Sequence, residues 1–81
     1  MMTITFYHKA GCHLCEKTRH QLQPLVQEFE LIVDEVDIAQ DADLYARYRY
    51  SIPVIDTRQG RLFMAPIDIG AVREVLLGQR S

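Results

Sequence analysis

The pattern of hydrophobic and polar residues predicts a strand and a long helix in the first third of the chain. Residues 3–7 are rich in β-branched and aromatic side chains and place Ile4 and Phe6 on one face, as in a half-buried strand. From residue 12 or 13 to Phe29, apolar residues recur at helical spacing. The expected inner side of this helix consists of Leu14, Leu22, Leu25, Val26 and Phe29, with Thr18 filling a turn.

The predicted helix contains a proline, and its remaining positions are mostly polar. Pro24 lacks an N–H group, and its ring crowds the preceding turn. It is therefore expected either to kink the helix or to end it and start a second short turn. The solvated side is expected to carry Glu16, Lys17, Arg19 and Gln23.

The middle of the chain predicts a second strand and a short helix. Residues 31–37 form a largely apolar run of strand length. Asp41 is placed to cap a helix in which Leu44 and Tyr48 face the core, four residues apart. A strand, a helix and another strand suggest a βαβ unit with two parallel strands.

The last third predicts a β-hairpin and a final helix. Residues 51–56 and 61–65 are typical of two strands around a glycine-containing turn, and Pro53 should lie where the first of them begins. Asp68 is expected to cap a helix from about residue 69 to residue 77 that ends at Gly78. Its expected inner face consists of Ile69, Val72, Val75 and Leu76.

Length and composition limit the classes of function. A chain of 81 residues, nearly half of them hydrophobic, predicts a single α/β domain over residues 1–81, and we expect a monomer. The net charge of −2 gives no electrostatic reason to expect nucleic-acid binding. No apolar run reaches membrane-spanning length, and residues 1–4 do not resemble a secretion signal, so we expect a cytoplasmic protein without membrane association.

The two cysteines carry the candidate chemistry. Cys12 and Cys15 form a Cys-x-x-Cys motif where a strand gives way to a helix, and Gly11 permits the tight turn before it. The helix N-terminus and Lys9 should both lower the pKa of the Cys12 thiol, which favours the reactive thiolate. Cys15 lies one turn further on the same face, so we expect Cys12 to be the nucleophile and Cys15 the resolving thiol.

Other interpretations of the cysteine pair are possible. A zinc site needs further ligands, for which His8, His13 and His20 are the histidine candidates. Haem attachment requires a histidine directly after the second cysteine, where this chain has Glu16. Two inert buried thiols are the simplest alternative. His8 and His13 could tune a redox site near neutral pH, although both are also ordinary loop or surface residues.

The order β-α-β-α-β-β-α with Cys-x-x-Cys after the first strand resembles the thioredoxin fold, a central mixed four-stranded sheet flanked by helices. Within it the chain is similar to glutaredoxins, most clearly at Lys9-Ala10-Gly11-Cys12-His13-Leu14-Cys15, Glu35-Val36-Asp37-Ile38 and Tyr50-Ser51-Ile52-Pro53-Val54. The resemblance implies a cis bond between Ile52 and Pro53. It also implies that the backbone of Ile52 pairs with substrate as an added strand.

The resemblance implies a thiol–disulfide oxidoreductase that reduces or exchanges disulfides in a protein or a glutathione-linked substrate. Its substrate site would include Ile52, Pro53 and His13, and oxidation would join Cys12 to Cys15. No tightly bound cofactor or metal is expected. Glutathione as co-substrate or a thioredoxin-reductase-like enzyme would supply the electrons. Two further classes stay open, namely a metal or iron–sulfur module that uses the same cysteines and an adaptor that keeps only the fold.

The chain departs from glutaredoxins at two places. Glutaredoxins carry Cys-Pro-Tyr-Cys, whereas His13-Leu14 stands between the cysteines here. They also carry a glycine pair in the turn before the last helix, which holds the glutamyl end of glutathione. This chain has Ala65-Pro66-Ile67-Asp68 in that turn, where Asp68 matches only the acidic member of the motif.

Overall fold

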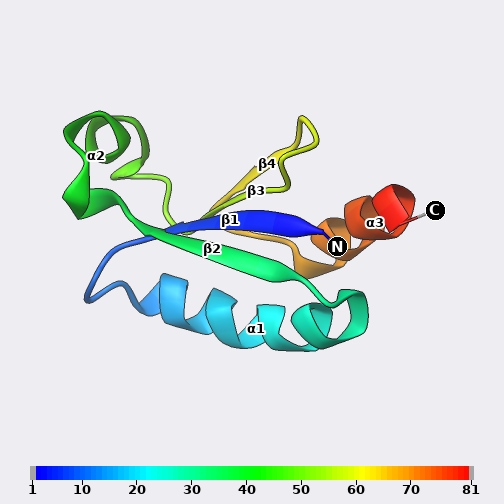
Figure 1. Ribbon diagram of the computed structural model, residues 1–81. Coiled ribbons are helices and arrows are strands. Elements are labelled where there is room, and N and C mark those ends of the chain that lie inside the picture. Colours follow the sequence, from blue (N-terminus) through cyan, green and yellow to red (C-terminus); the bar gives the residue numbers. More distant parts are fainter. Residues whose placement is uncertain (1, 81) are drawn as a thin grey trace.

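The computed structural model describes residues 2–80 and contains four strands, three α-helices and one short 3₁₀ helix. Figure 1 shows α1 running along one face of the sheet, with α2 and α3 near opposite ends. In chain order the elements are β1 (Thr3–His8), α1 (His13–Phe29), β2 (Ile32–Asp37), η1 (Ile38–Gln40), α2 (Ala42–Tyr48), β3 (Val54–Asp56), β4 (Leu62–Met64) and α3 (Ile69–Arg80).

The four strands form one mixed sheet in the order β2-β1-β3-β4. β1 and β2 are parallel, with Phe6 opposite Glu35, and the other two pairs are antiparallel. The parallel pair requires a crossover, which α1 provides. This arrangement confirms the predicted order of elements and the mixed sheet.

The alternation of side chains along β1 and β3 separates two hydrophobic clusters. Ile4, Phe6 and Ile55 belong to the larger cluster, in which they pack with residues of α1 and α3. Val54 belongs to the smaller cluster, with Ile38 and Tyr48 from the η1–α2 segment. Successive residues of a strand point to opposite faces, so each face of the sheet has its own helical cover.

The first helix continues through Pro24, so the proline does not end it. The helix ends at Phe29, where Glu30 adopts a left-handed conformation with φ 52°. The N–H groups of Glu30 and Leu31 both donate to the Val26 carbonyl, which satisfies an acceptor at the helix end.

Two expectations about helix faces are wrong. Leu14 was expected on the inner side of α1, but 54% of it is exposed, and Cys15, 1% exposed, occupies the buried position instead. Arg19 was expected on the solvated side, but it is half-buried and binds acidic side chains. The buried positions of α1 recur at three- and four-residue spacing from Cys15 through Leu22 to Phe29, and Leu14 lies one position off this stripe.

The last helix is longer than expected. Asp68 accepts a hydrogen bond from the Ala71 N–H at 3.2 Å, as a capping residue does. Gly78 was expected to end the helix, but α3 continues to Arg80. Gly78 is not among the residues with positive φ, so it does not adopt the left-handed conformation typical of a helix end. The buried side chains of Val72 and Leu76 anchor the helix, and their packing outweighs the low helix propensity of glycine.

Within the described residues, none of the helices has the length and apolar character needed to cross a membrane.

Candidate functional site

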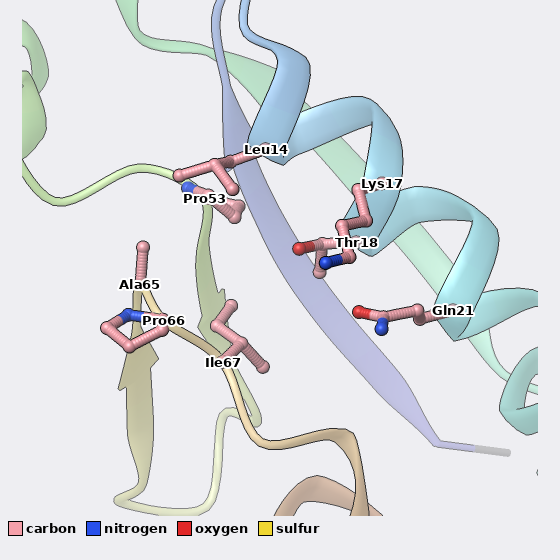
Figure 2. Close-up of a pocket in the computed structure, with 8 residues that line it drawn as sticks. All are labelled: Leu14, Lys17, Thr18, Gln21, Pro53, Ala65, Pro66 and Ile67. Carbon is pink, nitrogen blue, oxygen red and sulfur yellow. The ribbon is translucent and has the colours of Figure 1, made fainter.

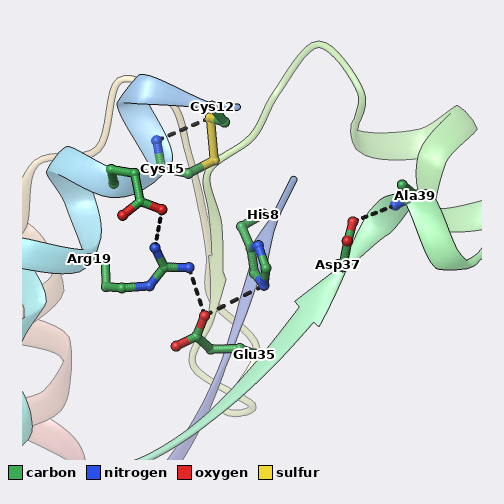
Figure 3. Close-up of polar contacts among 8 residues, drawn as sticks. His8, Cys12, Cys15, Arg19, Glu35, Asp37 and Ala39 are labelled. Carbon is green, nitrogen blue, oxygen red and sulfur yellow. Dashed lines mark hydrogen bonds and ion pairs between the residues drawn. A yellow bond between two sulfur atoms is a disulfide. The ribbon is translucent and has the colours of Figure 1, made fainter. Parts of the chain in front are cut away.

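The two cysteines form a disulfide at the start of α1, with their Cα atoms 5.2 Å apart (Figure 3). Gly11 has φ +77°, a conformation that favours glycine, and it turns the chain directly before Cys12. Cys12 is the N-cap residue in an extended conformation, and its Sγ accepts a hydrogen bond from the Cys15 N–H at 3.1 Å. The sulfur of Cys12 therefore occupies the position where a helix N-terminus favours an acceptor or a negative charge.

The two sulfur-bearing residues differ in exposure. Cys15 is 1% exposed and packs in the larger core cluster, whereas Cys12 is only half-buried. A partner in disulfide exchange can therefore reach Cys12 more readily than Cys15. This asymmetry agrees with the expected roles, which remain predictions.

The side chains expected to tune the site lie at its edge. His13 is exposed. Lys9 is half-buried, and its Nζ lies 6.0 Å from the centre of the Tyr45 ring. Stabilisation of a Cys12 thiolate by Lys9 and a substrate contact by His13 stay predictions.

The Ile52–Pro53 peptide bond is cis, which is the isomer implied by the resemblance, and Pro53 is fully buried. The Ile52 N–H donates to the Tyr48 carbonyl at 3.1 Å, and the Ser51 N–H donates to the same carbonyl at 2.8 Å. Pairing of Ile52 with a substrate through its N–H would require exchange of the longer bond. Tyr48 would keep the shorter bond, so its carbonyl would stay satisfied.

A cavity of about 100 Å³ lies between α1 and the cis-proline (Figure 2). One wall comes from α1 and the other from Pro53 and the segment 65–67, in which the Ala65–Pro66 bond is also cis. The lining residues are Leu14, Lys17, Thr18, Gln21, Pro53, Ala65, Pro66 and Ile67. The side chains of the wall opposite α1 are all apolar. In the α1 wall, the exposed side chain of Leu14 comes from between the two cysteines in the sequence.

A polar cluster of His8, Glu16, Arg19 and Glu35 lies close to the disulfide (Figure 3). Arg19 donates to Glu35 Oε1 at 2.7 Å and also binds Glu16, and its guanidinium lies 5.4 Å from the centre of the Phe6 ring. Hydrogen bonds to Glu35 and then Glu16 raise the pKa of Arg19, and the hydrogen bond from Arg19 lowers the pKa of Glu16. We name these four residues the His8–Arg19 cluster.

Sequence reasoning missed this cluster. One signal was present: Arg19 follows Cys15 by four residues and so lies on the same face of α1. The contribution of Glu35 depends on the register of β2 against β1, which places Glu35 opposite Phe6. That register is a tertiary feature that residue spacing does not reveal.

No group of three or more histidine, cysteine, aspartate or glutamate side chains with an arrangement suited to a metal ion occurs among residues 2–80.

The mixed sheet with its three helices, the Cys-x-x-Cys pair at the start of α1 and the cis-proline before β3 define a thioredoxin-like fold with a thiol redox-type site. Residues 3–77 match the family model described as glutaredoxin-like domain (DUF836), and the chain belongs to this family.

The chain is also similar to a solved structure, the X-ray structure of a Northeast Structural Genomics target protein, XcR50, from X. campestris. The two sequences are 29% identical, and the TM-score is 0.76. The match covers 93% of this chain and 96% of the other. Its similarity extends over nearly the whole thioredoxin-like fold.

Proposed function

We propose that the protein is a thiol–disulfide oxidoreductase in which Cys12 attacks and Cys15 resolves. The observation that carries the proposal is the asymmetry of the pair. The Cys12 Sγ accepts an N–H bond at a helix N-terminus and is accessible, while Cys15 is adjacent and buried. A thiolate is the attacking species, and this placement favours the thiolate of Cys12.

The reaction would consist of two exchanges. The Cys12 thiolate attacks one sulfur of a substrate disulfide and releases the other as a thiolate. The Cys15 thiol then loses its proton and attacks Cys12, which forms the internal disulfide and releases the reduced substrate. Lys9 would add positive charge near the Cys12 thiolate.

The preferred substrate would be a disulfide in a protein. The apolar wall formed by Pro53 and the segment 65–67 suits a hydrophobic side chain next to the half-cystine. Ile52 would bind the neighbouring substrate backbone as an added strand, and His13 would contact the exposed part of the substrate. The turn before α3 has Ala65-Pro66-Ile67 in place of the glycine pair that holds the glutamyl end of glutathione in glutaredoxins, which disfavours glutathione as the bound substrate.

Electrons would come from glutathione as co-substrate or from a thioredoxin-reductase-like enzyme. The protein would act in the cytoplasm as a monomer, without a tightly bound cofactor.

The test compares Cys12→Ser and Cys15→Ser with the wild type, using a peptide disulfide as substrate. Cys12→Ser should abolish exchange, because a hydroxyl cannot replace the thiolate. Cys15→Ser should accumulate a mixed disulfide between Cys12 and the peptide, detectable as an increase in mass that thiol reductants reverse. Unchanged turnover in Cys12→Ser, or no mixed disulfide in Cys15→Ser, contradicts the proposal.

A further inference from the structure

The His8–Arg19 cluster lies on the same side of the sheet as the buried cysteine. His8 stacks on Phe6 with ring centres 5.8 Å apart, and the guanidinium of Arg19 lies over the same Phe6 ring. Phe6 belongs to the core cluster that also contains Cys15. The imidazole of His8 is therefore on the face of β1 that α1 covers, together with the resolving thiol (Figure 3).

β1 ends at His8 and α1 begins at His13, so His8 and Cys15 both lie toward the same end of the sheet, and Figure 3 draws His8 between the disulfide and Glu35. The guanidinium of Arg19, at the end of a long side chain, lies 5.4 Å from the centre of the Phe6 ring. His8 lies two residues further along β1, about 6.6 Å by the rise of a strand. Cys15 lies four residues earlier in α1, about 6 Å by the rise of a helix, and α1 runs back along the sheet from the end of β1.

Charged groups surround His8 on two sides. From β2, Glu35 Oε1 lies 3.5 Å from His8 Nε2, and Asp37 is paired with His8 in the sheet register. From α1, Arg19 binds the same Glu35 oxygen and Glu16 interacts electrostatically with His8, and Lys9 follows His8 in the chain. The β3 residue at this end of the sheet, Val54 opposite Tyr7, is apolar. A carboxylate next to Nε2 favours a proton on that nitrogen, which leaves Nδ1 as the atom able to accept one.

A buried thiol needs such an acceptor. Cys15 is 1% exposed, so bulk water reaches its sulfur poorly, and a thiol must lose its proton before it attacks a disulfide. We propose that His8 accepts the proton of the Cys15 thiol during resolution of the mixed disulfide, and that Glu35, held by Arg19, positions the imidazole. This inference rests on the proposed function and names the residue that assists its second exchange.

The proton of Cys15 moves to His8, and the Cys15 sulfur forms a bond with the Cys12 sulfur. The bond between Cys12 and the substrate sulfur breaks, its electron pair leaves with the substrate thiolate, and water later removes the proton from His8. The two cysteines are oxidised to a disulfide, and the substrate sulfur is reduced. In the reverse direction His8 would return the proton to Cys15.

The test separates the two exchanges in time. Reduced protein is mixed with the chromogenic disulfide dithionitrobenzoate in a stopped-flow instrument. Attack by Cys12 releases a first coloured thiolate, and resolution by Cys15 releases a second. The rates of both phases are measured between about pH 6 and 8, where imidazole titrates. The variants are His8→Asn, Glu35→Gln and the control His20→Asn, which changes an exposed histidine of α1.

In the wild type, the second phase should rise with pH and then level off as the imidazole becomes neutral. In His8→Asn it should be about 100-fold slower at neutral pH and rise continuously with thiol ionisation, because a general base contributes about 10²-fold or more. Glu35→Gln should slow it several-fold and change its pH profile. The first phase should stay within about twofold in these variants, and His20→Asn should match the wild type in both phases.

A second phase with unchanged rate and pH profile in His8→Asn overturns the role of His8. If that variant does not fold, the same result in Glu35→Gln overturns the inference, because Glu35 is exposed and glutamine has the same size. A wild-type protein that never releases the second thiolate overturns the proposed function and this inference with it. The two failures are therefore distinct.

Discussion

Replacement of Leu14 by serine should weaken binding of peptide disulfides that carry a hydrophobic residue next to the half-cystine. Leu14 lies between the cysteines, lines the cavity beside Pro53 and is 54% exposed. An exposed leucine at this point contributes little to the packed core. It gains burial only when a substrate covers it.

The expected magnitude follows from the exposed fraction. Full burial of a leucine side chain stabilises by about 1.5 to 3 kcal/mol. The exposed 54% therefore corresponds to about 0.8 to 1.6 kcal/mol if the substrate covers it completely. Loss of this burial free energy in Leu14→Ser should lower kcat/KM about 4- to 15-fold, because 1.4 kcal/mol corresponds to a factor of ten.

The assay measures kcat/KM for two short peptide disulfides, one with leucine and one with serine next to the half-cystine. Leu62→Ser is the matched control, because Leu62 is 46% exposed and lies in β4, outside the residues that line the cavity. Leu14→Ser should affect the leucine peptide more than the serine peptide, whereas Leu62→Ser should affect neither. Equal losses with both peptides, or equal effects of the two variants, refute the assignment of this cavity to substrate binding.

Three further predictions concern stability, each measured by urea unfolding of the oxidised protein. Leu76→Ala should lower the free energy of unfolding by about 2 to 5 kcal/mol, because Leu76 is fully buried on the inner face of α3 and its truncation leaves a cavity; a loss below about 1 kcal/mol would contradict the packing described. Arg73→Gln should destabilise at neutral pH but match the wild type in acid, because the hydrogen bond from Arg73 lowers the pKa of Glu28. The contribution of a lowered carboxyl pKa is complete above the pKa of the unfolded chain and is lost as pH falls through the folded value, so the two urea midpoints should converge below about pH 4.3. A constant difference at all pH values would exclude this linkage. Gly78→Ala should stabilise by up to about 1 kcal/mol, because α3 continues through this position and a Cβ there meets nothing within 4 Å. Gly60→Ala is its counterpart and should destabilise by about 1 kcal/mol, because φ is +89° there. Destabilisation by Gly78→Ala would contradict the continuation of α3 through residue 78.

The features that depend on local sequence could be predicted. Alternation placed Ile4 and Phe6 on the buried face of β1, and Asp41 caps α2 by accepting from the Asp43 and Leu44 N–H groups. The position of Cys12 at the start of a helix follows from the strand-to-helix change in periodicity. These properties are determined by a few neighbouring residues, so the spacing of residues is sufficient to find them.

The features that depend on tertiary contacts could not be predicted. Leu14 is exposed because the stripe of α1 that packs on the sheet begins at Cys15, whereas hydrophobicity alone suggested that Leu14 is buried. The pairing of Arg19 with Glu35 requires the β1–β2 register. The continuation of α3 past Gly78 reflects packing against the sheet, which outweighs the low helix propensity of glycine.

The central claim is that Cys12 and Cys15 have different reactivities as a redox pair. The most direct measurement is the rate at which the reduced protein reacts with a thiol-specific alkylating agent across pH, with mass spectrometry to locate the modified residue. We predict that Cys12 reacts first, with a pKa below the ordinary value of about 8.5, while Cys15 reacts slowly. Two slow thiols with ordinary pKa values would contradict the account and favour an adaptor. Thiols that react only after a chelator is added would favour a metal or iron–sulfur module.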